Sequence, residues 1–207
     1  MINGIKSIFV VSFLILGCNS NVNLKNISSQ EIKNLNMNIY SDKGKKILSI
    51  KSPNSVFDKE KNIFNLKETT INIIQDKKIK YIINSDSSKL SNINKILELE
   101  GNVKVKTVKQ DNDQLYANKF IWNIDKSNYL LIGDVNFENN NIVLSSTKAN
   151  LGTDNIIEFF NPVKYKIKSN NNEGSNVINA ENAFYNIKTK SVTFRSNKKR
   201  VKSNIYF

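Results

Sequence analysis

Apolar and polar residues alternate along the chain from about residue 39 onward. The pattern is plainest over residues 97–105, 129–137 and 157–167, and polar clusters at residues 58–62 and 125–128 separate such runs. A period of two is typical of strands that bury one face, and polar clusters between strands are typical of turns. Because no long stretch has a helical period, the chain is predicted to be all-β.

Similar units recur along this pattern. Aligning Thr69, Gly101, Gly133, Asn161 and Ser196 gives spacings of 32, 32, 28 and 35 residues, with strands and a polar turn ahead of each. A lone hairpin cannot bury its apolar face in water, whereas hairpins that stack on one another can. The repeat therefore predicts an elongated roll of stacked antiparallel hairpins.

Two of the seven glycines, Gly101 and Gly133, stand in mid-strand at the same phase of this repeat. A glycine inside a strand weakens it and usually marks a bulge, a bend or a close backbone approach. We therefore expect the sheet to bend there in successive units and to fold over its own apolar face. A plain sandwich with glycines at bulges fits the same periodicity.

The N-terminus has the features of an export signal. Lys6 precedes an uncharged, mostly apolar run at residues 7–17, which is shorter than the about 20 residues of a membrane-spanning helix. The end of this run, ILGC, resembles a bacterial lipoprotein signal, with Cys18 as the lipidated residue. A plain signal peptide or short anchor is the alternative. The predicted organisation is a signal peptide at 1–17, lipidated Cys18 with a polar tether at 18–38, and a β-domain at 39–207.

Composition excludes several classes of function. Histidine is absent and Cys18 is the sole cysteine, so the commonest general base, the commonest metal ligand and intramolecular disulfides are all missing. Since there is also no GxSxG motif, neither an enzyme nor a metal or cofactor is expected. The net charge of +13 suits an anionic partner or reflects drift in composition. No nucleic-acid recognition motif is present, and the export signal argues against that partner.

Several segments, in order, resemble the LptC family of OstA-like domains. The resemblance covers residues 39–150 and is carried by a polar turn with glycine, short alternating strands and small residues at fixed places. The segments are YSDKGKKILSIKS at 40–52, VFDKEKNIF at 56–64, LELEGNVKV at 97–105, LYANK at 115–119, LIGDVNF at 131–137 and IVLSS at 142–146.

This resemblance implies a β-jellyroll, or taco-shaped roll, on the periplasmic side of the inner membrane. It implies lipopolysaccharide export, with an inner-membrane ABC transporter and a periplasmic bridge protein of similar fold as partners through edge-to-edge pairing. Gly44, Gly101 and Gly133 match glycines of the family pattern. Two features depart from the family: a lipid anchor in place of a transmembrane helix, and additional hairpins at residues 151–207. A structural or adhesive β-roll lipoprotein without a transport role is the alternative function.

A bent sheet with one apolar face would form a trough for acyl chains, because burial of apolar surface is favourable. Ordinary core packing is the alternative role for each residue that would line it. Lys104, Lys106, Lys164 and Lys166 are expected at the rim, where lipid phosphates would lie. The trough candidates are Leu97, Leu99, Val103, Val105, Phe120, Trp122, Tyr129, Leu131, Val135, Phe137, Phe159, Val163 and Phe194.

Overall fold

The chain folds entirely as strands and turns in the part that the structure describes. The computed structural model describes residues 28–108, 113–126, 128–152, 154–160, 162–168, 177–196 and 202–204, with no helix among them. No helix in this part is therefore long and apolar enough to cross a membrane. The all-β prediction is confirmed.

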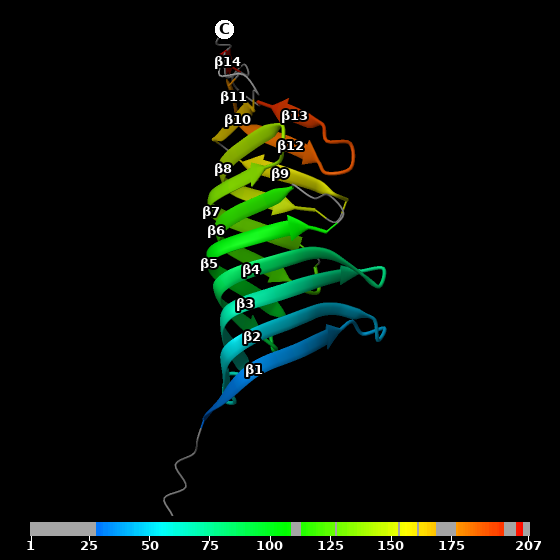
Figure 1. Ribbon diagram of the computed structural model, residues 1–207, viewed down its shortest axis with the longest axis vertical. Coiled ribbons are helices and arrows are strands. Elements are labelled where there is room, and N and C mark those ends of the chain that lie inside the picture. The colour runs from blue at the N-terminus through cyan, green and yellow to red at the C-terminus, as the bar shows by residue number, and fades with distance from the viewer. Residues whose placement is uncertain are drawn as a thin grey trace, which may run out of the picture.

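Eight long strands build most of the sheet and pair antiparallel in sequence order, each with the next (Figure 1). They stack along the long axis of the molecule, and β1 lies at one end. The long strands are β1 (Ser29–Tyr40), β2 (Lys46–Asp58), β3 (Ile63–Gln75), β4 (Lys78–Ser91), β5 (Ile96–Thr107), β6 (Gln114–Asn123), β7 (Asn128–Glu138) and β8 (Ile142–Leu151).

Beyond β8 the sheet divides into two branches made of short strands. The second half of β8 pairs with β9, which leads to β12 and β13, and the first half pairs with β10, which leads to β11 and β14. The short strands are β9 (Ile156–Phe160), β10 (Val163–Ile167), β11 (Val177–Ala180), β12 (Asn182–Asn186), β13 (Val192–Arg195) and β14 (Lys202–Asn204).

The branches continue a division that runs through the whole sheet, because most long strands bend near their middle. Pairing shifts register there between neighbouring strands, for example between Glu100 and Val103 of β5 and between Ile132 and Val135 of β7. The bends separate two leaves. Leaf A comprises residues 29–33, 54–58, 63–67, 87–91, 96–100, 119–123, 128–132 and 148–151 with β9, β12 and β13. Leaf B comprises residues 35–40, 46–52, 69–75, 78–85, 103–107, 114–117, 135–138 and 142–146 with β10, β11 and β14.

The predicted role of the mid-strand glycines is confirmed. Gly101 and Gly133 both have a φ of 76° and lie at the bends of β5 and β7. At the corresponding bend of β3, Glu68 has a φ of 49°, one residue before the repeat position Thr69. β3, β5 and β7 thus each have left-handed backbone at the same position of the repeat. These bends lie in line, so the sheet folds over along that line. The repeat position Asn161 lies outside the described residues.

We expect Gly101→Ala to lower the free energy of unfolding by about 2 kcal/mol, because an L-residue is strained at positive φ and a Cβ has no room. That Cβ would lie 2.5 Å from Oδ2 of Asp86, which accepts a 2.8 Å hydrogen bond from Asn102. Gly44→Ala is the control, since Gly44 has a similar φ of 69° but no atom within 4 Å. Urea denaturation should show a loss of only about 1 kcal/mol for this control; equal losses would contradict the role of crowding at the bend.

The folded domain begins earlier than expected. Residues 29–38, predicted to be tether, belong to β1, which pairs along its length with β2. Its side chains on one face, Leu35, Met37 and Ile39, pack against the core, while the rest of the strand is largely exposed. The tether prediction failed here because this edge strand has few apolar residues, so its alternation of apolar and polar residues is hard to see in the sequence. The signal at 1–17 and the lipidation site Cys18 lie outside the described residues.

Candidate functional site

The apolar interior between the leaves is the candidate functional site. All thirteen trough candidates belong to this interior: twelve are buried, and Phe194 is half-buried against the others. Leaf A contributes Leu97, Leu99, Phe120, Trp122, Tyr129, Leu131, Phe159 and Phe194, and leaf B contributes Val103, Val105, Val135, Phe137 and Val163. The structure therefore brings together every candidate. Their role in binding lipid stays a prediction.

Aromatic rings connect the two leaves across this interior. The Phe137 ring of leaf B lies 4.4 Å from the Tyr185 ring and 6.4 Å from the Phe159 ring of leaf A, between centroids. Nearer β1, Tyr81 of leaf B meets Tyr129 of leaf A edge-on at 6.4 Å, and Tyr129 lies 5.2 Å from Trp122. Contacts of this kind add to the area that the rings bury and hold the leaves at a fixed separation.

Opposite the line of bends, the leaves end in two rows of hairpin turns, and an open hollow lies between these rows near β1. We call this opening the mouth. The hollow has a volume of about 560 Å³. Its wall includes Ile39 and Ile73 of leaf B and Trp122 and Tyr129 of leaf A, so the floor is apolar. Turn residues from both leaves complete the lining, among them Asp42, Lys95 and Asp125.

A lysine reaches the mouth from leaf B because of a β-bulge. In the pairing of β3 with β4, Ile73 faces Tyr81 and Ile74 faces Ile79, so Lys80 is the extra residue. A bulge re-aims the side chain that it carries. Lys80 lines both the mouth hollow and an adjoining hollow of about 390 Å³, and its Nζ lies 5.1 Å from the centroid of the Tyr81 ring.

The electrostatics of the mouth follow from burial. Desolvation lowers the pKa of Lys80, with a smaller contribution from the charge of Lys188, while Asp154 and Asp76 act to raise it. Burial also raises the pKa of Tyr129 to about 12 and raises that of Tyr81 further. The tyrosines therefore stay neutral at physiological pH and can donate hydrogen bonds.

The rim lysines predicted from sequence were misplaced. Strand alternation puts Lys104, Lys106, Lys164 and Lys166 on the outer face of leaf B, where Lys104 lies 5.0 Å from the centroid of the Tyr116 ring. The lysines at the mouth are Lys95, in a hairpin turn, and Lys80. The position of Lys80 depends on a bulge, which the alternation of apolar and polar residues does not reveal.

Sequence reasoning also missed the interior residues contributed by β2 to β4. They show the same alternation as the later strands and complete the interior near β1. They include Leu48, Ile50, Leu66, Ile71, Ile73, Tyr81, Ile83 and Leu90.

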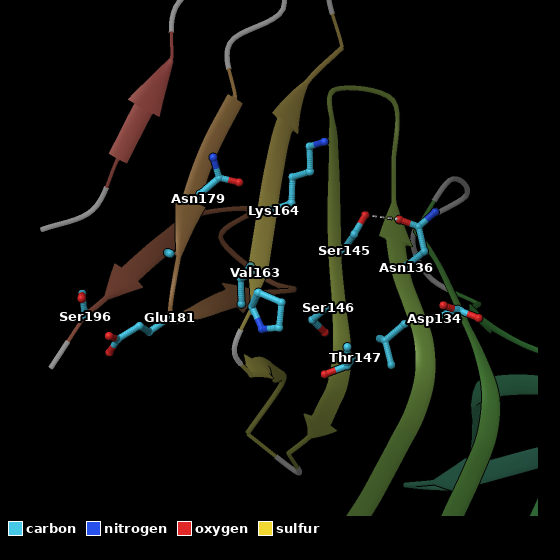
Figure 2. A pocket seen from close by; sticks show the side chains of 13 residues that line it. Asp134, Asn136, Ser145, Ser146, Thr147, Val163, Lys164, Asn179, Glu181 and Ser196 are labelled. Atoms are coloured by element: carbon cyan, nitrogen blue, oxygen red, sulfur yellow. Dashed lines mark hydrogen bonds between the residues drawn. The ribbon is translucent and has the colours of Figure 1, made fainter. Parts of the chain in front are cut away.

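A second hollow of about 720 Å³ lies where the sheet divides (Figure 2). The trough candidates Val135 and Val163 form part of its wall, and most of the other residues that line it are of polar type, including Asp134, Lys164 and Glu181. Asn136 and Ser145, on neighbouring strands, are joined by a 3.1 Å hydrogen bond in this view.

Away from β1, polar contacts connect the ends of the two leaves. Lys190, in the turn after β12 of leaf A, forms an ion pair with Asp113 at the start of β6 in leaf B. Asn139, in the turn after β7 of leaf B, donates a 3.1 Å hydrogen bond to the Tyr185 hydroxyl of leaf A. We call these two contacts the clasp. The mouth is thus hollow near β1 and bridged near β12.

Comparison with known proteins identifies the family of the chain. The model of the lipopolysaccharide-assembly, LptC-related family matches residues 17–151. The chain belongs to this family. A comparison with curated proteins gives no match. Among solved structures, LptH of Pseudomonas aeruginosa, described as an LptA-homologous periplasmic component of the lipopolysaccharide transport device, is similar at a TM-score of 0.47 and 14% identity, over 61% of this chain and 94% of that chain.

Membership of the LptC-related family confirms the resemblance that the sequence motifs indicated. By this membership the chain is a component of lipopolysaccharide assembly and is not an enzyme. The three family glycines lie at structural turning points: Gly101 and Gly133 at bends, and Gly44 in the turn between β1 and β2. Beyond the family match, the described strands β9 to β14 form the two branches that follow β8.

Proposed function

We propose that the chain binds lipopolysaccharide in the interior between its leaves and passes it from an inner-membrane ABC transporter to a periplasmic bridge protein. The observation that carries the proposal is the unbroken apolar interior, to which strands from β2 to β12 contribute buried side chains. Acyl chains gain free energy when they leave water for such a surface, by about 25 cal/mol per Å². No catalytic step is needed, since ATP hydrolysis by the transporter would supply the energy.

Open strand edges support a hand-over between similar folds. In the described part of the chain, β1 pairs with β2 alone, so its other edge is open to a further strand, and its twelve residues are exposed or half-buried. β13 and β14 end the two branches at the opposite end of the sheet. Pairing of such edges between proteins of like fold would continue both the sheet and its apolar interior.

A lipidated Cys18 would hold the domain close to the membrane. Ten residues lie between Cys18 and Ser29, the first residue of β1. Even fully extended, such a segment reaches about 40 Å at most. The edge of β1 would therefore face a membrane-embedded partner, and the far branches would face the periplasm.

A photo-crosslinking residue at Phe137 tests lipid binding in cells. Phe137 is 1% exposed and points into the interior, whereas its neighbour Asn136 points outward from the same strand. We expect position 137 to capture lipopolysaccharide and position 136 to capture little or none, as judged by immunoblotting for the lipid-shifted band. If position 137 captures no lipopolysaccharide while the protein is folded and anchored, the interior is only a core.

A pull-down from solubilised membranes separates transport from the structural or adhesive alternative. The transport proposal expects an ABC permease to co-purify with the full chain. Its absence, together with capture of lipid at position 137, would keep lipid binding and overturn the proposed partner.

A further inference from the structure

Two buried donors beside the mouth, and one lysine that lines it, form no hydrogen bond or ion pair through their side chains in the part of the chain that the structure describes. The Tyr81 hydroxyl and the Trp122 indole nitrogen are buried and form no hydrogen bond. Lys80, at the bulge beside Tyr81, forms no ion pair with a described residue. Buried donors without acceptors are costly, and each one calls for an explanation.

These groups converge on one place from both leaves. Lys80 and Tyr81 belong to β4 of leaf B, and Trp122 belongs to β6 of leaf A. Lys80 and Trp122 line the same hollow, and the rings of Tyr81 and Trp122 both pack against Tyr129. Lys80 therefore lies in the wall of the hollow, and two buried neutral donors lie next to it behind the apolar floor.

We infer that the mouth is a binding subsite for the phosphorylated head of an acylated lipid, with Lys80, Tyr81 and Trp122 as its polar contacts. Two carboxylates, Asp42 and Asp125, also line the hollow, but both interact with Lys95. Because Lys80, Tyr81 and Trp122 are all hydrogen-bond donors, the group complementary to them is an acceptor with negative charge. The apolar floor formed by Ile39, Ile73 and Tyr129 suits acyl chains attached to that group. A free phosphate ion would leave this floor uncovered.

This inference rests on the proposed function and adds which part of the lipid is recognised, and where. The nearby charges are consistent with it. Lys95, on the opposite side of the hollow, is already paired with Asp125 at 3.1 Å, so Lys80 is the cation left to meet a ligand. Deprotonation of Lys80 is easier than for an exposed lysine, because desolvation lowers its pKa, and a bound phosphate would restore the charged form.

The sequence provides its own reporter for the test, because Trp122 is the sole tryptophan of the chain. The full-length chain, held in phosphatidylcholine nanodiscs, is titrated with lipid A, with lipid A after removal of its phosphates, and with inorganic phosphate. We expect lipid A to shift the emission of Trp122 and dephosphorylated lipid A to bind about tenfold more weakly, the effect of losing one charge-assisted hydrogen bond. Inorganic phosphate should leave the emission unchanged.

Two variants and a matched control assign the effect to residues. Lys80→Gln should weaken lipid A binding about tenfold, and Tyr81→Phe should weaken it severalfold. Tyr81→Phe removes only a hydroxyl without a partner, so a purely structural role for Tyr81 predicts an unchanged or raised melting temperature and unchanged binding. Lys104→Gln is the control, because Lys104 also lies 5.0 Å from a tyrosine ring but on the outer face.

Each outcome decides between the subsite and the proposed function. Equal binding of lipid A and its dephosphorylated form, or unchanged binding by Lys80→Gln, overturns the subsite and leaves lipid transport standing. A shift in Trp122 emission with inorganic phosphate alone overturns the assignment to a lipid. Failure of the unmodified chain to bind either lipid overturns both the subsite and the proposed function.

Discussion

Phe137→Ala is expected to lower the free energy of unfolding by about 3–5 kcal/mol, the range for truncating a large aromatic side chain in a core. Phe137 is 1% exposed and contacts two rings of the opposite leaf, Tyr185 at 4.4 Å and Phe159 at 6.4 Å. Removing the ring loses the free energy gained when its carbons leave water on folding. It also leaves a cavity that the two leaves close only in part. Urea denaturation followed by circular dichroism measures the loss.

Asn136→Ala is the matched control from the same strand. Its side chain points outward and accepts a 3.1 Å hydrogen bond from Ser145, so its loss should cost about 1 kcal/mol. Similar losses for the two variants would mean that the leaves do not depend on the Phe137 contacts for their separation. Phe137→Leu, which keeps most of the apolar volume, should fall between the two.

The fold could be predicted from sequence because the chain repeats one simple pattern. Alternation in the strands and the 32-residue spacing of Gly101 and Gly133 predicted stacked hairpins with a common bend, and both glycines lie at bends with positive φ. The division after β8 could not be predicted, because it depends on which half of β8 each of β9 and β10 pairs with. The alternation within β9 and β10 does not contain this information. The strand at Ser29–Tyr40 was missed since an edge strand needs only one weakly apolar face.

Prediction of the site was limited by what alternation can say. It identifies which residues face inward, and it found Trp122 and Phe137 in this way. It does not identify a bulge, because a single extra residue changes the facing of a side chain without changing its type. Lys80 was therefore missed, and the lysines chosen for the rim, such as Lys104, lie on the outer face. Contacts between distant turns, such as Lys190 with Asp113, leave no local signal either.

Lys190→Met is expected to cost about 3 kcal/mol in the free energy of unfolding, because it leaves the carboxylate of Asp113 without its cation. The Asp113 side chain is 3% exposed, whereas that of Lys190 is 41% exposed. Because only the carboxylate is buried, the expected loss of stability lies at the low end of the range for breaking a buried ion pair. Most of that loss is the cost of leaving the Asp113 charge buried without a partner. Lys188→Met, on the same turn, is the control and should cost less than about 0.5 kcal/mol.

The reverse substitution should be tolerated far better, and this difference tests the clasp. Asp113→Asn removes the buried charge and leaves Lys190 in contact with water, so we expect a loss of about 1 kcal/mol. Adding Asp113→Asn to Lys190→Met should then recover most of the stability lost in the single Lys190 variant, since no buried charge remains. In Lys190→Met alone, backbone hydrogen exchange should rise first in β12 and β13, because this variant removes one of the two polar contacts of the clasp. If exchange instead rises uniformly along the sheet, the pair stabilises the whole fold and does not close one end of the mouth.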